Sequence, residues 1–174
     1  LEINWDEGPD IGGDYGPYKQ TQRLDIYKKY LEKLLADDKI YHCFCTEQEL
    51  EAKRQEQMSR GLAPKYDGTC SHLSKDIVKK NLAEGKSSVL RFRVENKKVK
   101  FTDLIRGEVE FDAGLLGDVV VAKDMDSPLY HFAVVVDDFE MKISHVIRGE
   151  EHLANTPRQI LIQEALGFYQ PTYA

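Results

Sequence analysis

The spacing of apolar residues changes twice along this chain, and these changes restrict the folds that it can adopt. Between residues 18 and 37 the apolar side chains recur at intervals of three and four, which predicts an amphipathic helix. Short runs rich in β-branched and aromatic residues follow between 87 and 123, which predicts a small antiparallel sheet. A helical pattern returns with Thr156 as the expected N-cap and Pro157 after it, and it ends at Gly167. This order predicts an α/β layer with an α+β segment inserted into it.

Local signals predict where further elements begin and end. The run IYHCFC at 40–45 predicts a short strand. Thr46 and Glu49 form a capping-box pattern, so a helix is expected to start there and to end before Gly61. Ser74 is the expected N-cap of a second, shorter helix.

Two later segments are less uniform. PLYHFAVVVDDFEM, residues 128–141, has the composition of a strand and the length of a helix, so both assignments stay open. KISHVIRG, residues 142–149, predicts a buried strand. The change of period divides the chain into a first outer segment (residues 1–40), an insert (residues 41–127) and a second outer segment (residues 128–174). None of these segments carries a glycine-rich dinucleotide loop or a Walker loop.

Composition excludes several classes of protein. Apolar residues make up 41% and charged residues 31% of the chain, which is typical of globular proteins. No apolar run approaches the length of a membrane span, so no membrane partner is expected. Three cysteines cannot form a closed set of disulfides, which favours a reducing, cytoplasmic compartment. The first residue is leucine and no signal peptide is present, so we expect a processed or excerpted chain.

The charge of the chain is unevenly distributed. The net charge is −6, yet the segment 75–106 holds ten basic residues against four acidic ones. A local basic segment in an acidic protein attracts phosphate groups. The alternative is a charged face that only contacts solvent.

Three cysteines and one histidine form the strongest local motif. Cys43 and Cys45 point to the same side of an extended strand, and Cys70 with His72 repeats this spacing. Four such ligands suit a closed, structural Zn²⁺ site with tetrahedral geometry. His42 lies on the opposite strand face and is not counted. The alternative is that the thiols pack as small apolar groups and His72 is exposed.

A series of motifs resembles one enzyme family over the whole chain. WDEGPD and GGDYGPYKQTQR are followed by YHCFCT, YDGTC, LRFRV, FTDLIRGEVEF and VVDDFEMKISHVIRGEEHLANTPRQILIQEALGF. In this order they resemble bacterial glutamyl-tRNA synthetases of class I. The resemblance implies a Rossmann-type catalytic domain with an inserted α+β acceptor-binding domain that carries a zinc knuckle. It also implies activation of glutamate by ATP with Mg²⁺, and transfer of glutamate to the 3′ end of tRNA. DNA is not an expected partner.

Two sequence signatures of that family are missing from this chain. The family signatures His-Ile-Gly-His and Lys-Met-Ser-Lys-Ser are both absent. We therefore expect an internal piece of the catalytic domain that is inactive by itself, and we assign no catalytic residue. Two alternatives stay open. One is the glutamyl-queuosine tRNA(Asp) synthetase-like paralogue, whose zinc knuckle is spaced differently and usually includes a tyrosine. The other is a stand-alone zinc-containing RNA-binding module.

The resemblance also implies roles for residues after the insert. Tyr130 and Arg148 match positions that bind glutamate, and a guanidinium suits a carboxylate because it binds with two parallel hydrogen bonds. Glu151 and His152 match positions near the adenosine end of ATP. The alternative for Arg148 is a structural ion pair with Glu150 or Glu151.

Two arginines of the insert match positions that hold the tRNA acceptor end. They are Arg54 and Arg106. Arginine binds phosphate and also stacks on unpaired bases, as a splayed 3′ end requires. The alternative for Arg54 is an ordinary charge on a helix surface.

Overall fold

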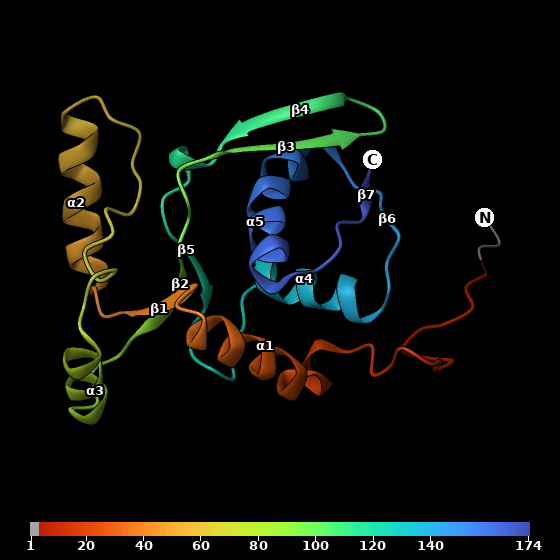
Figure 1. Ribbon diagram of the computed structural model, residues 1–174, viewed down its shortest axis with the longest axis horizontal. Helices are drawn as coiled ribbons and strands as arrows, with labels where there is room; N and C mark the ends of the chain where they lie inside the picture. The colour runs from red at the N-terminus through yellow and green to blue at the C-terminus, as the bar shows by residue number, and fades with distance from the viewer. Residues whose placement is uncertain (1–3) are drawn as a thin grey trace.

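Helices and strands are arranged around one helical core in the computed structural model, which describes residues 4–174 (Figure 1). The α-helices are α1 (Leu24–Ala36), α2 (Glu47–Ser59), α3 (Lys75–Ala83), α4 (Tyr130–Glu140) and α5 (Thr156–Leu166). The strands are β1 (Ile40–Cys43), β2 (Val89–Phe92), β3 (Lys98–Asp103), β4 (Gly107–Asp112), β5 (Val119–Ala122), β6 (His145–Val146) and β7 (Thr172–Tyr173). Three short 3₁₀ turns are η1 (Gln20–Gln22), η2 (Ala113–Leu115) and η3 (Glu150–Asn155).

The strands form two sheets rather than the single small sheet predicted for 87–123. One sheet has the order β1-β2-β5 and is antiparallel. The other has the order β4-β3-β7-β6, in which β7 pairs parallel with both β3 and β6. The prediction was wrong because β3 buries only alternate residues, Val99, Phe101 and Asp103. Such a strand covers a core with one face and leaves the other in solvent, so the β3–β4 hairpin lies over α5 instead of beside β2.

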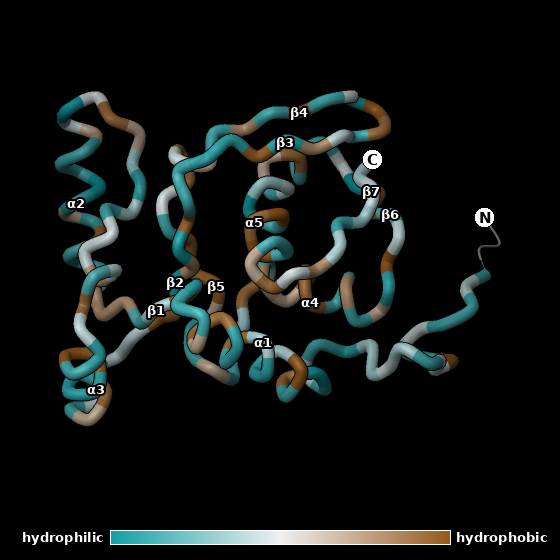
Figure 2. Tube along the Cα trace, viewed as in Figure 1, coloured by the Kyte–Doolittle hydropathy of each residue, from teal (hydrophilic) through white to brown (hydrophobic). Residues whose placement is uncertain are grey.

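The core lies between α1, α4 and α5. Buried residues of these helices include Tyr27, Leu31, Leu34, Phe132, Val135, Val136, Ile160 and Ile162. This packing decides the open assignment of 128–141, because residues 132, 133, 135 and 136 are buried, which is a helical period. By contrast α2 buries no residue, and Figure 2 shows it as largely hydrophilic along its length. It stands apart from the core at the left of Figure 1.

A buried ion pair joins α1 to α4. The Arg23 side chain is 1% exposed, and its Nε donates to Asp137 Oδ1 at 2.7 Å. The Tyr27 hydroxyl donates to the same carboxylate at 2.8 and 2.9 Å. Arg23 also donates to the Pro17 carbonyl at 2.8 Å. The start of α1 is therefore fixed to the end of α4.

The predicted helix ends are largely confirmed. Thr46 and Glu49 form the capping box, and the Ser74 hydroxyl accepts from the α3 backbone. Gly167 ends α5 in the left-handed conformation, with φ of 73°. The start of α5 differs by one residue, because Asn155 is the N-cap and Thr156 is already helical.

The segment 142–149 does not form the predicted buried strand. Only His145 and Val146 are in strand conformation, and neither is buried. In the described part of the chain, β6 has β7 as its single partner and lies at the edge of the sheet. No helix formed by residues 4–174 combines the length and the apolar character needed to cross a bilayer. The division at 40/41 and 127/128 stays a prediction.

Candidate metal centre and substrate site

Three thiols and one phenol meet where β1 ends. The ligand atoms of Cys43, Cys45 and Cys70 all lie within 4.8 Å of one another. The Sγ atoms of Cys45 and Cys70 are 3.6 Å apart. The Tyr66 hydroxyl lies 3.3 Å from Cys43 Sγ and 3.6 Å from Cys45 Sγ. Three sulfur atoms and one oxygen thus face a common centre, and such a donor set suits Zn²⁺.

Local structure places each of these groups. β1 ends at Cys43, so the period of the strand brings Cys45 to the same side two residues later. The Phe44 backbone N–H donates to Cys70 Sγ at 3.4 Å, and the Cys70 N–H donates to the Tyr66 hydroxyl at 2.9 Å. Backbone hydrogen bonds therefore hold the loop between α2 and α3 against the end of β1.

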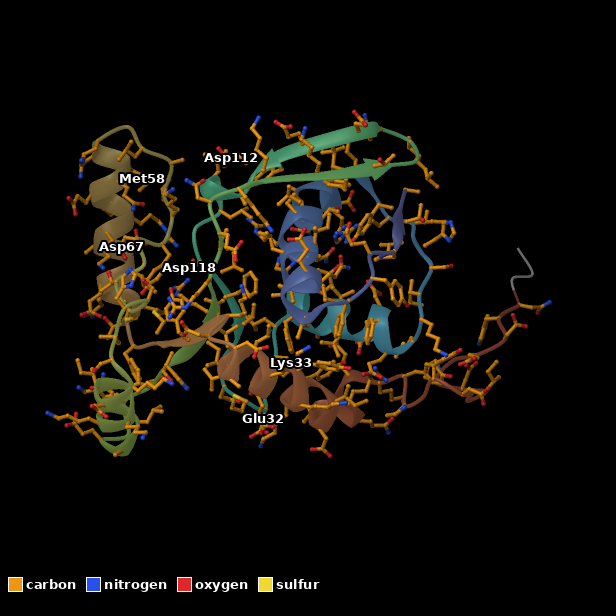
Figure 3. All side chains as sticks on the ribbon, viewed as in Figure 1. Glu32, Lys33, Met58, Asp67, Asp112 and Asp118 are labelled. Carbon is orange, nitrogen blue, oxygen red and sulfur yellow. The ribbon has the colours of Figure 1, made fainter. Side chains whose placement is uncertain are left out.

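The loop is also fixed to α2. Lys53 on α2 pairs with Asp67 at 2.8 Å and contacts Thr69. This interaction lowers the pKa of Asp67 to about 2, although burial acts in the opposite direction. Figure 3 shows Asp67 beside α2 and Asp118 nearer to β5. The thiol cluster lies in the region that these contacts hold together.

The thiols differ in how readily they ionise. Burial by itself raises the pKa of Cys43, but hydrogen bonds from Tyr66 and Arg91 and the charge of Arg91 outweigh it, so the pKa is lowered. Burial raises the pKa of Cys45 to about 11, with a further contribution from the neighbouring Cys70. A bound cation would instead lower the pKa of Cys45, because it stabilises thiolates directly.

His72 does not join this cluster. Its side chain is not buried, and it is not among the residues whose ligand atoms gather within 4.8 Å. Tyr66 takes the corresponding place, although its sequence context did not single it out. The signal that could have predicted it is the spacing Tyr66-x₃-Cys70 in a loop that must return to β1. His72 as a zinc ligand stays a prediction.

A second cluster lies between the N-terminal ends of α4 and α5. The Tyr130 ring is 5.3 Å from the ring of His131 and 6.4 Å from that of His152. Arg148 follows β6, and its backbone N–H donates to the Ala174 carbonyl at 3.0 Å. The structure thus brings Tyr130 and His152 together, and the charge of Arg148 acts on the intervening His131.

Neutral acceptors orient the Arg148 guanidinium. It donates to Gln159 Oε1 at 2.8 Å and to Thr156 Oγ1 at 2.6 Å. Both acceptor residues are buried, with 3% and 2% exposure. A guanidinium has five N–H donors, so donors remain free for a ligand. The sequence pattern assigned Thr156 only to helix capping and did not indicate Gln159, whose role depends on the approach of α5 to Arg148.

The alternative assignment of Arg148 to an ion pair is not supported. Within residues 4–174 no carboxylate forms an ion pair with Arg148. Glu150 pairs with Arg106 at 2.6 Å, and Glu151 lies 3.9 Å from His152 Nε2. The positive charge of Arg148 is therefore available to a bound anion.

Two buried polar atoms at this cluster have no partner among the described residues. They are His131 Nδ1 and Gln159 Nε2. Burial lowers the pKa of His131, and the charges of Arg158 and Arg148 lower it further, which favours the neutral form of the ring. Unpaired buried polar atoms are unusual in folded proteins. Together with the N-terminal ends of two helices, they indicate a site for a polar, anionic ligand.

The two arginines predicted to hold an RNA end lie far apart. Arg54 is on α2, pairs with Glu51 at 2.8 Å and lines a cavity of about 240 Å³ with Lys53 and Lys65. Arg106 is at the β3–β4 turn and lines a cavity of about 160 Å³ next to Arg148. Figure 1 shows α2 and this turn at opposite ends of the insert. They cannot hold the same nucleotide.

Comparison with known proteins identifies the family. The family model described as tRNA synthetases class I (E and Q), catalytic domain, matches residues 1–174. This chain belongs to that family. Its mixed α/β architecture is accordingly part of the class I Rossmann-like catalytic fold.

Members of the family are similar to this chain over nearly its whole length. The glutamate–tRNA ligase 1 of Caldicellulosiruptor saccharolyticus is 54% identical over 100% of this chain and 36% of its own length. The glutamate–tRNA ligase of Bacillus subtilis is 47% identical over 99% of this chain and 36% of its own length. A crystal structure of the glutamate–tRNA ligase from Elizabethkingia meningosepticum, in complex with its amino acid, has a TM-score of 0.88 and 39% identity. It covers 97% of this chain and 35% of that one.

Proposed function

We propose that this chain is part of a glutamate–tRNA ligase. Such an enzyme activates glutamate with ATP and Mg²⁺ and transfers it to the 3′ end of tRNA in the cytoplasm. The chain spans 36% of the curated relatives that it matches, so the activity belongs to a longer protein. The observation that supports glutamate as the substrate is Arg148, which is oriented by two buried neutral residues and has no carboxylate partner among the described residues.

The cluster around Arg148 has the chemistry for binding an amino-acid carboxylate. The guanidinium supplies parallel N–H donors that match the two oxygens of a carboxylate. The Tyr130 hydroxyl adds a further donor or acceptor, and neutral His131 adds a polar atom without adding charge. These residues position the substrate, and activation then depends on charge stabilisation more than on proton transfer.

Replacing Arg148 in the full-length enzyme tests this assignment. Loss of a charged, shielded contact costs about 2–5 kcal/mol, so Arg148→Ala should reduce kcat/KM for glutamate by a factor of tens to thousands. Arg148→Lys should recover little, because a lysine cannot reproduce two parallel hydrogen bonds. Affinity for tRNA should change much less.

A control arginine is available at Arg93, which lies outside this cluster and pairs with Asp38. Arg93→Ala should leave the KM for glutamate close to that of the unmodified enzyme. If Arg148→Ala keeps a normal KM and kcat for glutamate, Arg148 is structural and the proposed substrate site is wrong.

ATP and tRNA complete the proposed function. Glu151 and His152 lie on η3 next to the proposed glutamate site, and there they would approach the adenosine end of ATP. Arg106 is adjacent to this region, so it would contact the terminal nucleotides of the acceptor end. Arg54 is too distant for that role, and we assign it to the backbone of the acceptor stem near α2.

We further propose a structural Zn²⁺ at the thiol cluster. Cys43, Cys45 and Cys70 provide three sulfur ligands, and the Tyr66 oxygen fits the fourth position better than His72, which lies outside the cluster. Closed sites with four protein ligands are structural rather than catalytic. The ion would tie the loop between α2 and α3 to β1, and so would position α2 and Arg54.

Metal analysis of single variants tests the ligand set. The protein purified without chelators should contain one Zn²⁺ at this site, and Cys70→Ser should lower the zinc content. Tyr66→Phe should weaken zinc binding, whereas His72→Ala should not. The opposite result for the last two variants would assign the fourth position to His72, as the spacing of the cysteines and the histidine predicts. Absence of zinc from the purified protein, with three freely reacting thiols, would contradict the site altogether.

The similar proteins do not favour the two alternative functions. A tyrosine beside the cysteines is a feature expected of the queuosine-related paralogue, but the relatives that resemble this chain are glutamate–tRNA ligases. Tyrosine at the cluster therefore does not separate the two enzymes. A stand-alone RNA-binding module would not explain the Arg148 cluster, which lies outside the insert.

A further inference from the structure

Arg91 is a buried cation beside the thiol cluster. It lies on β2 with 7% exposure and pairs directly with Tyr41 on β1. Cys43 pairs with Val89, so Arg91 is the diagonal neighbour of Cys43 on the same face of the sheet. Diagonal neighbours on adjacent strands are within reach of a long side chain.

Two further contacts fix the guanidinium. Its Cζ lies 3.8 Å from the centroid of the Tyr66 ring, and its Nη1 donates to the Asp118 carbonyl at 2.9 Å. The Asp118 carboxylate forms no ion pair with Arg91 in the described part of the chain, and it accepts from the Tyr41 hydroxyl and the Val94 N–H. Among residues 4–174, Arg91 Nε has no hydrogen-bond partner. A buried, unpartnered donor and a positive charge therefore lie against the Tyr66 ring, whose hydroxyl contacts Cys43 and Cys45 Sγ.

The negative charge of the thiol cluster with Zn²⁺ bound would account for a buried arginine beside it. Three thiolates around Zn²⁺ leave a net charge of −1 in a largely buried position, and an ionised tyrosine would make it −2. A buried charge of this kind is costly unless an opposite charge accompanies it. Lys53 is also near, but it pairs with Asp67. Arg91 has no carboxylate partner in the described part of the chain, and a guanidinium cannot lose its proton.

We propose that Arg91 is the counter-charge and the positioning residue of the metal centre. It balances the thiolates through Cys43, and by stacking on the Tyr66 ring it directs the tyrosine hydroxyl toward the sulfur atoms. This inference rests on the proposed Zn²⁺ site. It adds a residue outside the ligand set that determines how tightly the ion is held.

Zinc affinity of Arg91 variants in the full-length protein tests the proposal. Affinity is measured by competition with a chromophoric chelator at one pH. Arg91→Met keeps the bulk of the side chain but removes the charge, and loss of such a partner typically weakens metal binding by about 10–100-fold. Arg91→Lys keeps the charge and should retain most of the affinity.

Arg93→Met is the matched control. Arg93 follows β2, stacks on the Tyr41 ring at 4.5 Å and pairs with Asp38, and no cysteine contact is present there among the described residues. This variant should bind zinc as tightly as the unmodified protein. If Arg91→Met does not fold, Arg91→Gln replaces it, because an amide can still donate to the Asp118 carbonyl without carrying charge.

The possible results distinguish a failure of the Arg91 inference from a failure of the proposed Zn²⁺ site. An affinity of Arg91→Met within about twofold of the unmodified protein would overturn the inference and leave the Zn²⁺ site intact. Equal losses for Arg91→Met and Arg91→Lys would also overturn it, because shape rather than charge would then matter. If the unmodified protein binds no zinc, the proposed site itself fails.

Discussion

Two adjacent aspartates in α4 should respond to the same substitution with opposite signs. Asp137 accepts hydrogen bonds from Arg23 at 2.7 Å and from Tyr27 at 2.8 Å. Asp138 forms no side-chain hydrogen bond among the described residues and lies in a partly buried position. Asparagine has nearly the same shape as aspartate, so Asp137→Asn and Asp138→Asn change mainly the charge.

Asp137→Asn should be strongly destabilising. The Arg23 side chain is 1% exposed, so loss of the carboxylate leaves a buried guanidinium without a counter-charge. Breaking a buried pair in this way costs about 3–5 kcal/mol. Asp137 itself is 17% exposed, which favours the lower end of that range. Even about 3 kcal/mol is a large fraction of the roughly 5–15 kcal/mol that is typical for the free energy of unfolding.

Asp138→Asn should be stabilising at pH 7. Burial and, next, the charge of Asp137 raise the pKa of Asp138 from 3.8 to about 6. A raised carboxyl pKa means that the folded state binds the proton more tightly, so stability falls as pH rises from about 4 to 6. The difference corresponds to about 3 kcal/mol, and solvent screening reduces it to about 1–2 kcal/mol. The variant should lose this advantage near pH 4, where the group is largely protonated.

Urea-induced unfolding, followed by circular dichroism at pH 7 and pH 4, measures both effects. Asp6→Asn serves as the control, because Asp6 is exposed and should change stability by less than about 0.5 kcal/mol. The reasoning is refuted if Asp137→Asn lies within about 1 kcal/mol of the unmodified chain at pH 7. It is also refuted if Asp138→Asn destabilises the protein equally at both pH values.

Two further outcomes are expected. Removing Zn²⁺ with a chelator should increase amide hydrogen exchange in the loop between α2 and α3, because the ion ties that loop to β1. Exchange in α5 should stay unchanged. An equal increase of exchange in both segments would contradict a local role of the ion. Thr46→Ala removes the capping box of α2, so it should reduce the free energy of unfolding of the insert by about 1 kcal/mol in a urea titration. A change near zero would show that the pair of Lys53 and Asp67 holds α2 without the cap.

Much of the metal centre could be predicted from the sequence, but not all of it. The cysteines were found because the period of a strand and the repeated spacing limit where their side chains can point. Tyr66 was missed because a tyrosine carries no such signal, and its hydroxyl reaches the sulfurs only when the loop folds back. His72 has the expected spacing but lies outside the cluster, because spacing does not determine which way a loop turns.

The proposed substrate site could also be predicted only in part from the sequence. Tyr130 and Arg148 were expected from the resemblance of the motifs around them. Gln159 and Thr156, which orient Arg148, come from a helix that the sequence pattern assigned only to packing and capping. Arg106 and Arg54 as contacts of the tRNA acceptor end stay predictions, and their elements lie far apart in Figure 1.

The sequence by itself determined most of the helix ends, several of the strands and the candidate cysteines, since each depends on side chains a few residues apart. Only the tertiary structure decided that the strands divide into two sheets, that Tyr130–Glu140 is a helix, and that Arg91 lies diagonally opposite Cys43 on the neighbouring strand. The physical reason is that strand pairing and burial depend on residues distant in the chain. A local pattern predicts which face of a helix or strand is apolar. The packing of the whole domain determines which other element covers that face.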